Sequence, residues 1–263
     1  MVKKLITGTK QLIVEEINQT VTITLNNPKY KNALSEELTP YLRKILKKIS
    51  KDSKYKLLII RGQGNSFCSG GNVKKMLTND KNESISVKSK VNALIKKQIE
   101  LTYLISSLKI PTIAVVTGAA AGAGFSLALS CDIRIGNSNA FFLSNYSKIG
   151  LTGDYGISWY LVKILGSSKA KEIMFLNERI YSKKAYELGI LNYLIDNNFD
   201  LELDKIINNI VSQPISALKL IKMNINFASN NSLTKSLELE AKNLIKSSMS
   251  EEHRKAILKF KKG

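Results

Sequence analysis

The chain has very few of the residues that build metal centres, disulfide frameworks and histidine-based sites. Only two cysteines, Cys68 and Cys131, and one histidine, His253, occur in 263 residues. The cysteines form no CxxC metal motif and are too few for a disulfide framework. We therefore expect no resident metal and a reducing, cytoplasmic setting. His253 lies in a charged C-terminal stretch, where we expect it to be a surface residue.

A clear membrane-spanning segment is also missing. The stretch 110–131 contains no charged residue and is long enough to cross a bilayer. Three glycines and Pro111 interrupt it, however, and Asp132 follows directly. A buried strand, a tight turn and a buried helix fit this pattern better, so we expect no contact with a membrane.

Acidic residues are scarce relative to basic ones. The chain has 40 Lys and Arg against 21 Asp and Glu, a net charge of +19, and the excess is almost all lysine. Proteins that read nucleic-acid sequence usually rely on arginine for bidentate base contacts, and the lysines here are spread along the whole chain. The composition therefore argues against nucleic acid and favours a phosphate-bearing ligand or an anionic partner.

Hydrophobic residues make up 44% of the chain, enough to fill the core of one large α/β domain. Alternating apolar residues predict a hairpin from 12–17 and 21–25, and Ser35 is expected to cap the helix that follows. Continuous apolar runs at 57–60 and 113–116 predict strands buried on both faces. The order of these elements predicts an α/β fold with a largely parallel sheet.

Beyond Gly166 the pattern becomes helical. Apolar residues at helical spacing predict helices over 167–176, 182–188, 201–212, 214–227, 233–247 and 250–260. We therefore expect two units, an α/β core over 1–195 and a helical region over 196–263. One core cannot cover all the apolar stripes of the second unit, so we expect the chain to self-associate.

Two stretches of small residues carry the chemistry. Residues 67–72 (FCSGGN) and 118–126 (GAAAGAGFS) each follow a β-branched apolar run. Small residues let a ligand approach the backbone closely. Two such turns on one sheet can direct two N–H groups at one carbonyl oxygen, which is the geometry of an oxyanion hole. Tight strand-to-helix turns without a ligand are the alternative.

Together with 27–34 (NPKYKNAL), 127–135 (LALSCDIRI) and 185–191 (AYELGIL), these motifs resemble the enoyl-CoA hydratase/isomerase, or crotonase, superfamily. The resemblance extends over essentially the whole chain. It implies a spiral of ββα units with a helical C-terminal trimerisation region, and assembly as a homotrimer or a dimer of trimers. Members bind acyl-CoA thioesters and stabilise an enolate at the thioester oxygen. Coenzyme A is then part of the substrate, and no separate cofactor is implied.

The resemblance also implies roles for individual residues. It places the two backbone N–H donors of the oxyanion hole at Gly71 and Ala123, and close backbone approach at Gly70. Three lysines lie where the family places groups near the phosphates of coenzyme A, although in a lysine-rich chain they could equally be solvated surface residues: Lys29, Lys31 and Lys74.

The chain departs from the hydratase pattern at both catalytic glutamates, whose positions are occupied by Ser126 and Tyr146. The nearest carboxylate is Asp154, in 150–156 (GLTGDYG). An aspartate at this place is similar to the epoxyphenylacetyl-CoA isomerase-like and double-bond isomerase branch. The dehalogenase branch has one there as a nucleophile, but with a His that this chain lacks nearby. The resemblance thus favours an enoyl-CoA isomerase with one carboxylate.

Other interpretations remain open at this point. Asp154 could cap a helix that starts near residue 155, and Tyr146 could be a packed aromatic rather than a hydroxyl donor. The chain could be a hydratase or an acyl-CoA hydrolase in which Tyr146 or Ser126 holds water. It could also be a non-catalytic or nucleic-acid-binding homologue, as the loss of both glutamates and the net charge would allow.

Overall fold

A computed structural model describes residues 2–71 and 86–260 of the chain. The polar, lysine-rich stretch 73–92, which from sequence we expect to form a flap, lies mostly outside the described residues, as does Lys74, whereas residues 87–92 are helical. Within the described residues, no helix is long and apolar enough to span a bilayer.

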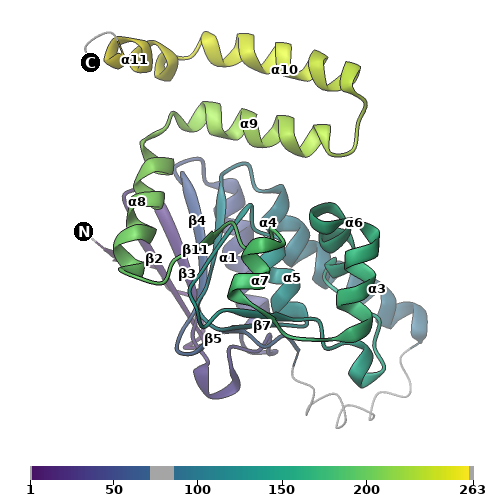
Figure 1. Cartoon of the computed structure of the whole chain (residues 1–263). Helices are drawn as coiled ribbons and strands as arrows, with labels where there is room; N and C mark the ends of the chain where they lie inside the picture. Colours follow the sequence, from purple (N-terminus) through teal and green to yellow (C-terminus); the bar gives the residue numbers. More distant parts are fainter. Residues whose placement is uncertain (1, 72–85, 261–263) are drawn as a thin grey trace.

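The core is built on a mixed sheet of seven strands, in the order β1-β2-β3-β4-β6-β8-β11 (Figure 1). The first three strands pair antiparallel and the others parallel. This confirms the predicted α/β fold and the hairpin, whose turn at Asn18 and Gln19 has two positive φ angles. The strands are β1 (Lys3–Lys4), β2 (Leu12–Ile17), β3 (Thr20–Leu25), β4 (Leu57–Gly62), β6 (Thr112–Val116), β8 (Ile133–Gly136) and β11 (Tyr193–Leu194).

A second sheet of four short strands, in the order β10-β9-β7-β5, carries the two small-residue motifs. The pattern of the sequence did not reveal this sheet, because its strands are only two or three residues long and β7 consists of alanine, which has little β propensity. Its strands are β5 (Ser66–Cys68), β7 (Ala119–Ala121), β9 (Phe141–Leu143) and β10 (Ile180–Tyr181). Strand β5 pairs parallel with β7, and β7 pairs parallel with β9.

The helix after β3 starts later than expected. Ser35 accepts a hydrogen bond from Leu38 N–H at 3.0 Å, but α1 (Thr39–Lys51) begins four residues after Ser35. Pro40 explains the difference, because its ring would clash with the carbonyl four residues earlier if the helix extended back to Glu36. Helix α1 buries the expected apolar stripe against the sheet, namely Leu42, Ile45, Leu46 and Ile49.

Further helices complete the core and surround the second sheet. Helix α3 (Val87–Gln98) continues through a π-helical segment (Ile99–Tyr103) into α4 (Leu104–Ser107). Helix α5 (Ala123–Leu129) is buried throughout. Helix α6 (Ile157–Leu176) kinks at Gly166, where φ is +77°, and α7 (Ser182–Glu187) follows. The elements from β5 to α6 therefore converge around α5, which positions the candidate site.

The C-terminal part is helical, as predicted. Helix α8 (Phe199–Ser212) packs on the face of the main sheet formed by alternate residues of β4 and β6, such as Leu57 and Ile113. Helices α9 (Ile215–Ala228) and α10 (Leu233–Ser248) lie side by side beyond the core, followed by α11 (Glu251–Phe260) (Figure 1). Lys222 joins α9 to the core through an ion pair with Asp132 at 2.6 Å.

Candidate active site

The two small-residue turns meet in the structure. Strands β5 and β7 run parallel, so the turns that follow them leave the second sheet at the same edge. Gly70 has φ +84°, and a side-chain Cβ there would lie 2.6 Å from the Ala121 carbonyl oxygen and 2.9 Å from the Ala123 nitrogen. The backbones are thus in direct contact, and only glycine fits at this point.

The segment before α1 braces the first turn. Ser69 N–H donates to the Lys31 carbonyl at 2.9 Å, and the Gly70 carbonyl accepts from Leu34 N–H at 2.8 Å. Asn32 is fully buried, and its amide donates to the carbonyls of Gln63 and Ser66 at 2.9 and 2.7 Å. The quoted motif 27–34 therefore shapes the turn that holds Gly70 and Gly71, a role for Asn32 that the sequence pattern did not show.

The predicted oxyanion donors lie on this pair of turns. Ala123 is the first residue of α5, so its N–H has no acceptor inside the helix. Gly122 before it has φ +52° and ψ −125°, a conformation that favours glycine. Gly71 follows Gly70 and is partly exposed. Gly71 and Ala123 therefore lie on two turns that are in contact through Gly70.

Asp154 is held by a side chain rather than by a helix end. Its Oδ1 accepts a hydrogen bond from Tyr146 O–H at 2.7 Å. The cap residue of α6 is Gly156, and no side chain caps that helix. The alternative interpretation of Asp154 as a helix cap is therefore not what the structure shows. Ser126 Oγ, on α5, donates to the backbone carbonyl of Asp154 at 3.0 Å.

Burial sets the proton affinity of this cluster. It raises the pKa of Asp154 above its ordinary value, and the hydrogen bond from Tyr146 opposes part of that rise. Burial, followed by the charge of Asp154, raises the pKa of Tyr146, so the phenol stays protonated. A carboxylate with a raised pKa beside a fixed hydroxyl donor is typical of a group that takes up and returns protons.

The loop that carries Asp154 has an unusual backbone. Positive φ values occur at Gly153 (+107°), Tyr155 (+53°) and Gly156 (+82°). Left-handed backbone at a tyrosine is uncommon and persists where the surroundings hold it. Here Gln98, the last residue of α3, accepts a hydrogen bond from Tyr155 N–H at 2.7 Å. Gln98 is a contributor to the site that the sequence pattern did not indicate, because 57 residues separate the two partners.

The carboxylate cluster adjoins the oxyanion turns. A Cβ placed on Gly122 would lie 3.9 Å from the Tyr146 hydroxyl, and Ser126 stands one turn along α5 from Gly122. The structure therefore brings Gly70, Ala123, Tyr146 and Asp154 together. Lys29 and Lys31 are exposed on the segment that braces the first turn. Lys74 lies outside the described residues.

The two cysteine thiols are buried and resist ionisation. Burial raises the pKa of both Cys68 and Cys131 to about 12, so neither thiol ionises readily. Across residues 2–71 and 86–260, no three His, Cys, Asp or Glu side chains gather where they could hold a metal ion. His253 is exposed on α11, as expected. The chemistry available is proton transfer by a carboxylate next to backbone N–H donors.

Residues 15–262 match the family described as enoyl-CoA hydratase/isomerase. The chain is 31% identical over 230 residues to the 1,2-epoxyphenylacetyl-CoA isomerase of Escherichia coli (strain K12), covering 84% of this chain and 83% of that protein. It is also 31% identical over 217 residues to the short-chain-enoyl-CoA hydratase of Clostridium acetobutylicum, covering 82% and 80%. The crystal structure of an enoyl-CoA hydratase from Polaromonas sp. JS666 matches with a TM-score of 0.86 and 30% identity over 95% and 96% of the chains. The chain therefore belongs to the enoyl-CoA hydratase/isomerase family.

Proposed function

We propose that this protein moves the double bond of an enoyl-CoA thioester, with Asp154 as its single proton-transfer group. The observation that carries this proposal is the contact of the partly buried Asp154 carboxylate with the Tyr146 hydroxyl, beside the turn that precedes Ala123. Relatives of the chain bear both isomerase and hydratase names. The choice between these activities therefore depends on what the site itself can do.

In the proposed reaction, the thioester oxygen accepts hydrogen bonds from Gly71 N–H and Ala123 N–H. These bonds strengthen as negative charge grows on that oxygen, so they stabilise the enolate more than the bound substrate. Asp154 takes a proton from C2 of a 3-enoyl thioester and becomes a neutral acid. It then donates that proton to C4 of the delocalised enolate. The double bond moves to C2–C3, the carboxylate is regenerated, and no water is consumed.

The bonding of Tyr146 and Ser126 supports isomerisation over hydration. Adding water requires a group that holds and activates the water as well as one that supplies a proton. Both hydroxyls at the former glutamate positions already donate to Asp154, one to its side chain and one to its backbone. Neither is a carboxylate that could serve as a second base.

The proposal is tested with a panel of 3-enoyl-CoA thioesters of different chain length. We expect conversion to the conjugated 2-enoyl-CoA. The increase in absorbance of the conjugated thioester measures this conversion. Failure to turn over or bind any member, together with heparin binding that collapses as salt increases, would instead favour a non-catalytic, nucleic-acid-binding homologue.

Coenzyme A would enter past the segment that braces the first turn. Lys29 and Lys31 are exposed there and carry positive charge beside the oxyanion turns. We propose that Lys29, Lys31 and Lys74 contact the phosphates of coenzyme A, and that Gly70 lets the CoA portion approach the backbone closely. In this proposal coenzyme A is bound as part of the substrate and no other cofactor takes part.

Replacing Tyr146 with phenylalanine is expected to shift the pH dependence of kcat/KM. The Tyr146 O–H bond favours the charged form of Asp154 and so lowers its pKa. Without that bond the pKa of the carboxyl rises, and because the base must be ionised, the acid limb of the profile moves to higher pH. Tyr186→Phe, at an exposed tyrosine, is the control. An unchanged acid limb in the Tyr146 variant would contradict this role.

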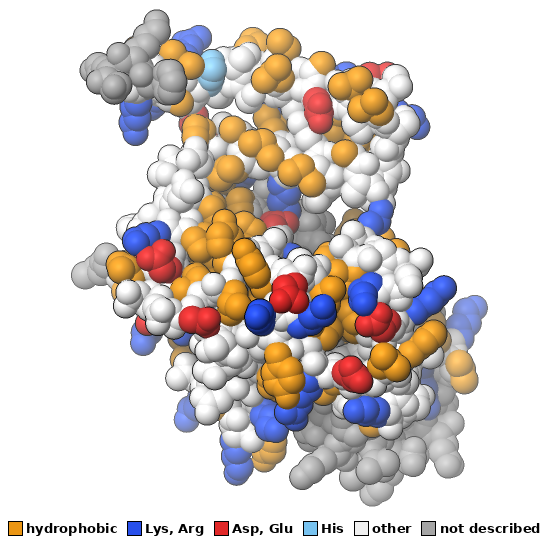
Figure 2. Space-filling view, in the orientation of Figure 1, with side chains coloured by type: hydrophobic (Ala, Val, Ile, Leu, Met, Phe, Trp, Pro, Cys, Tyr) orange, Lys and Arg blue, Asp and Glu red, His pale blue; other side chains and the backbone are white. Residues whose placement is uncertain are grey.

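We also propose that residues 196–263 are a trimerisation region, and that the protein is a homotrimer or a dimer of trimers. Large apolar side chains of this region are exposed in the single chain, including Ile225 (65%), Leu237 (55%) and Leu244 (68%). Figure 2 shows hydrophobic side chains on the α9–α10 layer and on the core surface near it. Sedimentation is expected to give a trimer or hexamer that Leu244→Glu weakens. A stable monomer at micromolar concentration would refute the prediction.

A further inference from the structure

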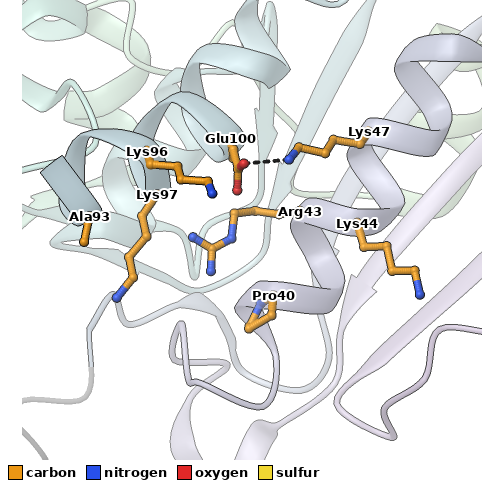
Figure 3. Close-up of a pocket in the computed structure, with 8 residues that line it drawn as sticks. All are labelled: Pro40, Arg43, Lys44, Lys47, Ala93, Lys96, Lys97 and Glu100. Atoms are coloured by element: carbon orange, nitrogen blue, oxygen red, sulfur yellow. Dashed lines mark hydrogen bonds and ion pairs between the residues drawn. The ribbon is translucent and has the colours of Figure 1, made fainter.

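A basic groove lies between α1 and α3, outside the proposed active site (Figure 3). Its volume is about 480 Å³, within the range of small-molecule sites. None of its lining residues belongs to the oxyanion turns or the Asp154 cluster. Five of the eight lining residues are cations and one is an acid. Helix α1 contributes Pro40, Arg43, Lys44 and Lys47, α3 contributes Ala93, Lys96 and Lys97, and the π-helical segment contributes Glu100.

The single acid of the groove already has a partner. Lys47 Nζ lies 2.6 Å from Glu100 Oε1, and this bond lowers the pKa of Glu100, to which the charges of Lys96 and Arg43 also contribute. Among residues 2–71 and 86–260, no carboxylate lies within ion-pair distance of Arg43, Lys96 or Lys97. The groove therefore keeps a strong excess of positive charge.

Two neighbouring helices direct these charges into one groove. Arg43 and Lys47 are four residues apart on α1, and Ala93, Lys96, Lys97 and Glu100 share one face of the other helix, so each set points into the same space. Helix α1 is anchored by its buried apolar stripe, and the second helix by Leu101 and Thr102 in the π-helical segment. The buried stripe of α1 fixes the helix that carries Arg43, whereas Lys96 and Lys97 are exposed side chains on α3, one turn before the buried Leu101.

Arginine marks the centre of the groove. Figure 3 shows the Arg43 guanidinium between the two helices, on the same side as the tips of Lys96 and Glu100. Arg43 is half-buried and is one of five arginines in a chain whose other cations are lysines. A guanidinium offers a planar fork that binds two oxygens of a phosphate at once. Pro40 and Ala93 are short, and they leave room beside it for a ligand.

We propose that this groove is a binding site for a phosphate-bearing anion of nucleotide size, held by Arg43 together with Lys96 and Lys97. Two sources share this chemistry: the nucleotide end of an acyl-CoA, and a free nucleoside diphosphate. The charge excess, the guanidinium fork and the volume support the site independently of the reaction proposed above.

Titration calorimetry with ADP at constant ionic strength tests the site. The double variant Arg43→Gln with Lys96→Gln is expected to weaken ADP binding at least about tenfold, since it removes two charge-assisted contacts. The matched control is Arg254→Gln with Lys171→Gln, which removes the same charge from exposed helix positions and should leave ADP binding within about twofold. Thermal melting confirms that each variant is folded.

A variant that is expected to change ADP affinity in the opposite direction strengthens the test. Glu100→Gln removes the only negative charge of the groove and is expected to tighten ADP binding several-fold, which misfolding cannot imitate. ADP affinity that is the same in the groove variant and the wild type, or that falls equally in the control, would overturn the proposal.

The two sources are separated by equilibrium binding of crotonyl-CoA and crotonyl-pantetheine, which lacks the nucleotide. If the groove takes the nucleotide of the substrate, the double variant weakens crotonyl-CoA binding and leaves crotonyl-pantetheine unchanged. If the groove takes a free nucleotide, the double variant binds both thioesters with unchanged affinity and binds ADP more weakly. These measurements do not require turnover, so they stand apart from the test of the proposed isomerisation.

Discussion

Replacing Asp154 with asparagine is expected to lower the rate of enoyl-CoA isomerisation by ~10²–10⁴, the usual loss when a general base is removed. Asparagine keeps the size of the side chain and an oxygen that can accept the Tyr146 hydrogen bond, whose length is 2.7 Å in the wild type. The Ser126 bond to the backbone carbonyl of residue 154 does not involve the replaced group. What asparagine cannot do is take up and return a proton.

Binding measurements distinguish this result from a distorted site. Acyl-CoA affinity is expected to stay close to that of the wild type, because the role proposed for Asp154 is in the chemical step. Asp196→Asn, at an exposed position, is the control for the same chemical change. Gly71→Pro, which removes one oxyanion donor, should in contrast also weaken the binding of enolate analogues. Full activity with asparagine at 154 would remove Asp154 from the mechanism and make Tyr146 the next residue to test.

The parts of the site that the sequence could predict are those encoded by local pattern. Each small-residue turn comes after an apolar β-branched run, so strands β4 and β6 and both turns could be recognised from local pattern, whereas the short strands β5 and β7 could not. That the turns meet, with a Cβ on Gly70 only 2.9 Å from Ala123 N, follows from the parallel pairing of β5 and β7. The resemblance implied this contact; hydrophobic pattern alone did not.

The parts that escaped prediction depend on contacts between distant segments. Tyr146 contacts Asp154 across a loop with positive φ at Gly150 and Gly153, and Tyr155, directly after Asp154, also has left-handed backbone, which no propensity favours at a tyrosine. Gln98 holds that loop from the end of a helix 57 residues earlier in the chain. The basic groove likewise needs α1 and α3 side by side, with Lys47 and Glu100 53 residues apart. Tertiary packing fixes each of these, and a local pattern has no access to it.

Hydration of crotonyl-CoA is expected to be very weak, far below the rate at which the protein isomerises its best 3-enoyl-CoA. By the resemblance, Ser126 and Tyr146 occupy the positions of the two hydratase glutamates, and neither side chain is a carboxylate that could activate a water molecule. Ser126 is fully buried and Tyr146 is 6% exposed. Their hydroxyls donate to Asp154 at 3.0 and 2.7 Å, and holding a water would require breaking one of these bonds.

The measurement is the loss of the conjugated thioester absorbance of crotonyl-CoA at saturating substrate, compared with isomerisation under the same conditions. Loss of a general base typically lowers a rate by ~10²–10⁴. The rate of hydration should therefore be at least ~10² lower than the rate of isomerisation. Asp154→Asn should leave the residual hydration small, because no other carboxylate of the cluster replaces it. Hydration at ~10 per second, the ordinary turnover of a working enzyme, would mean that Tyr146 or Ser126 leaves Asp154 and holds water once substrate is bound, and the protein would then be a hydratase.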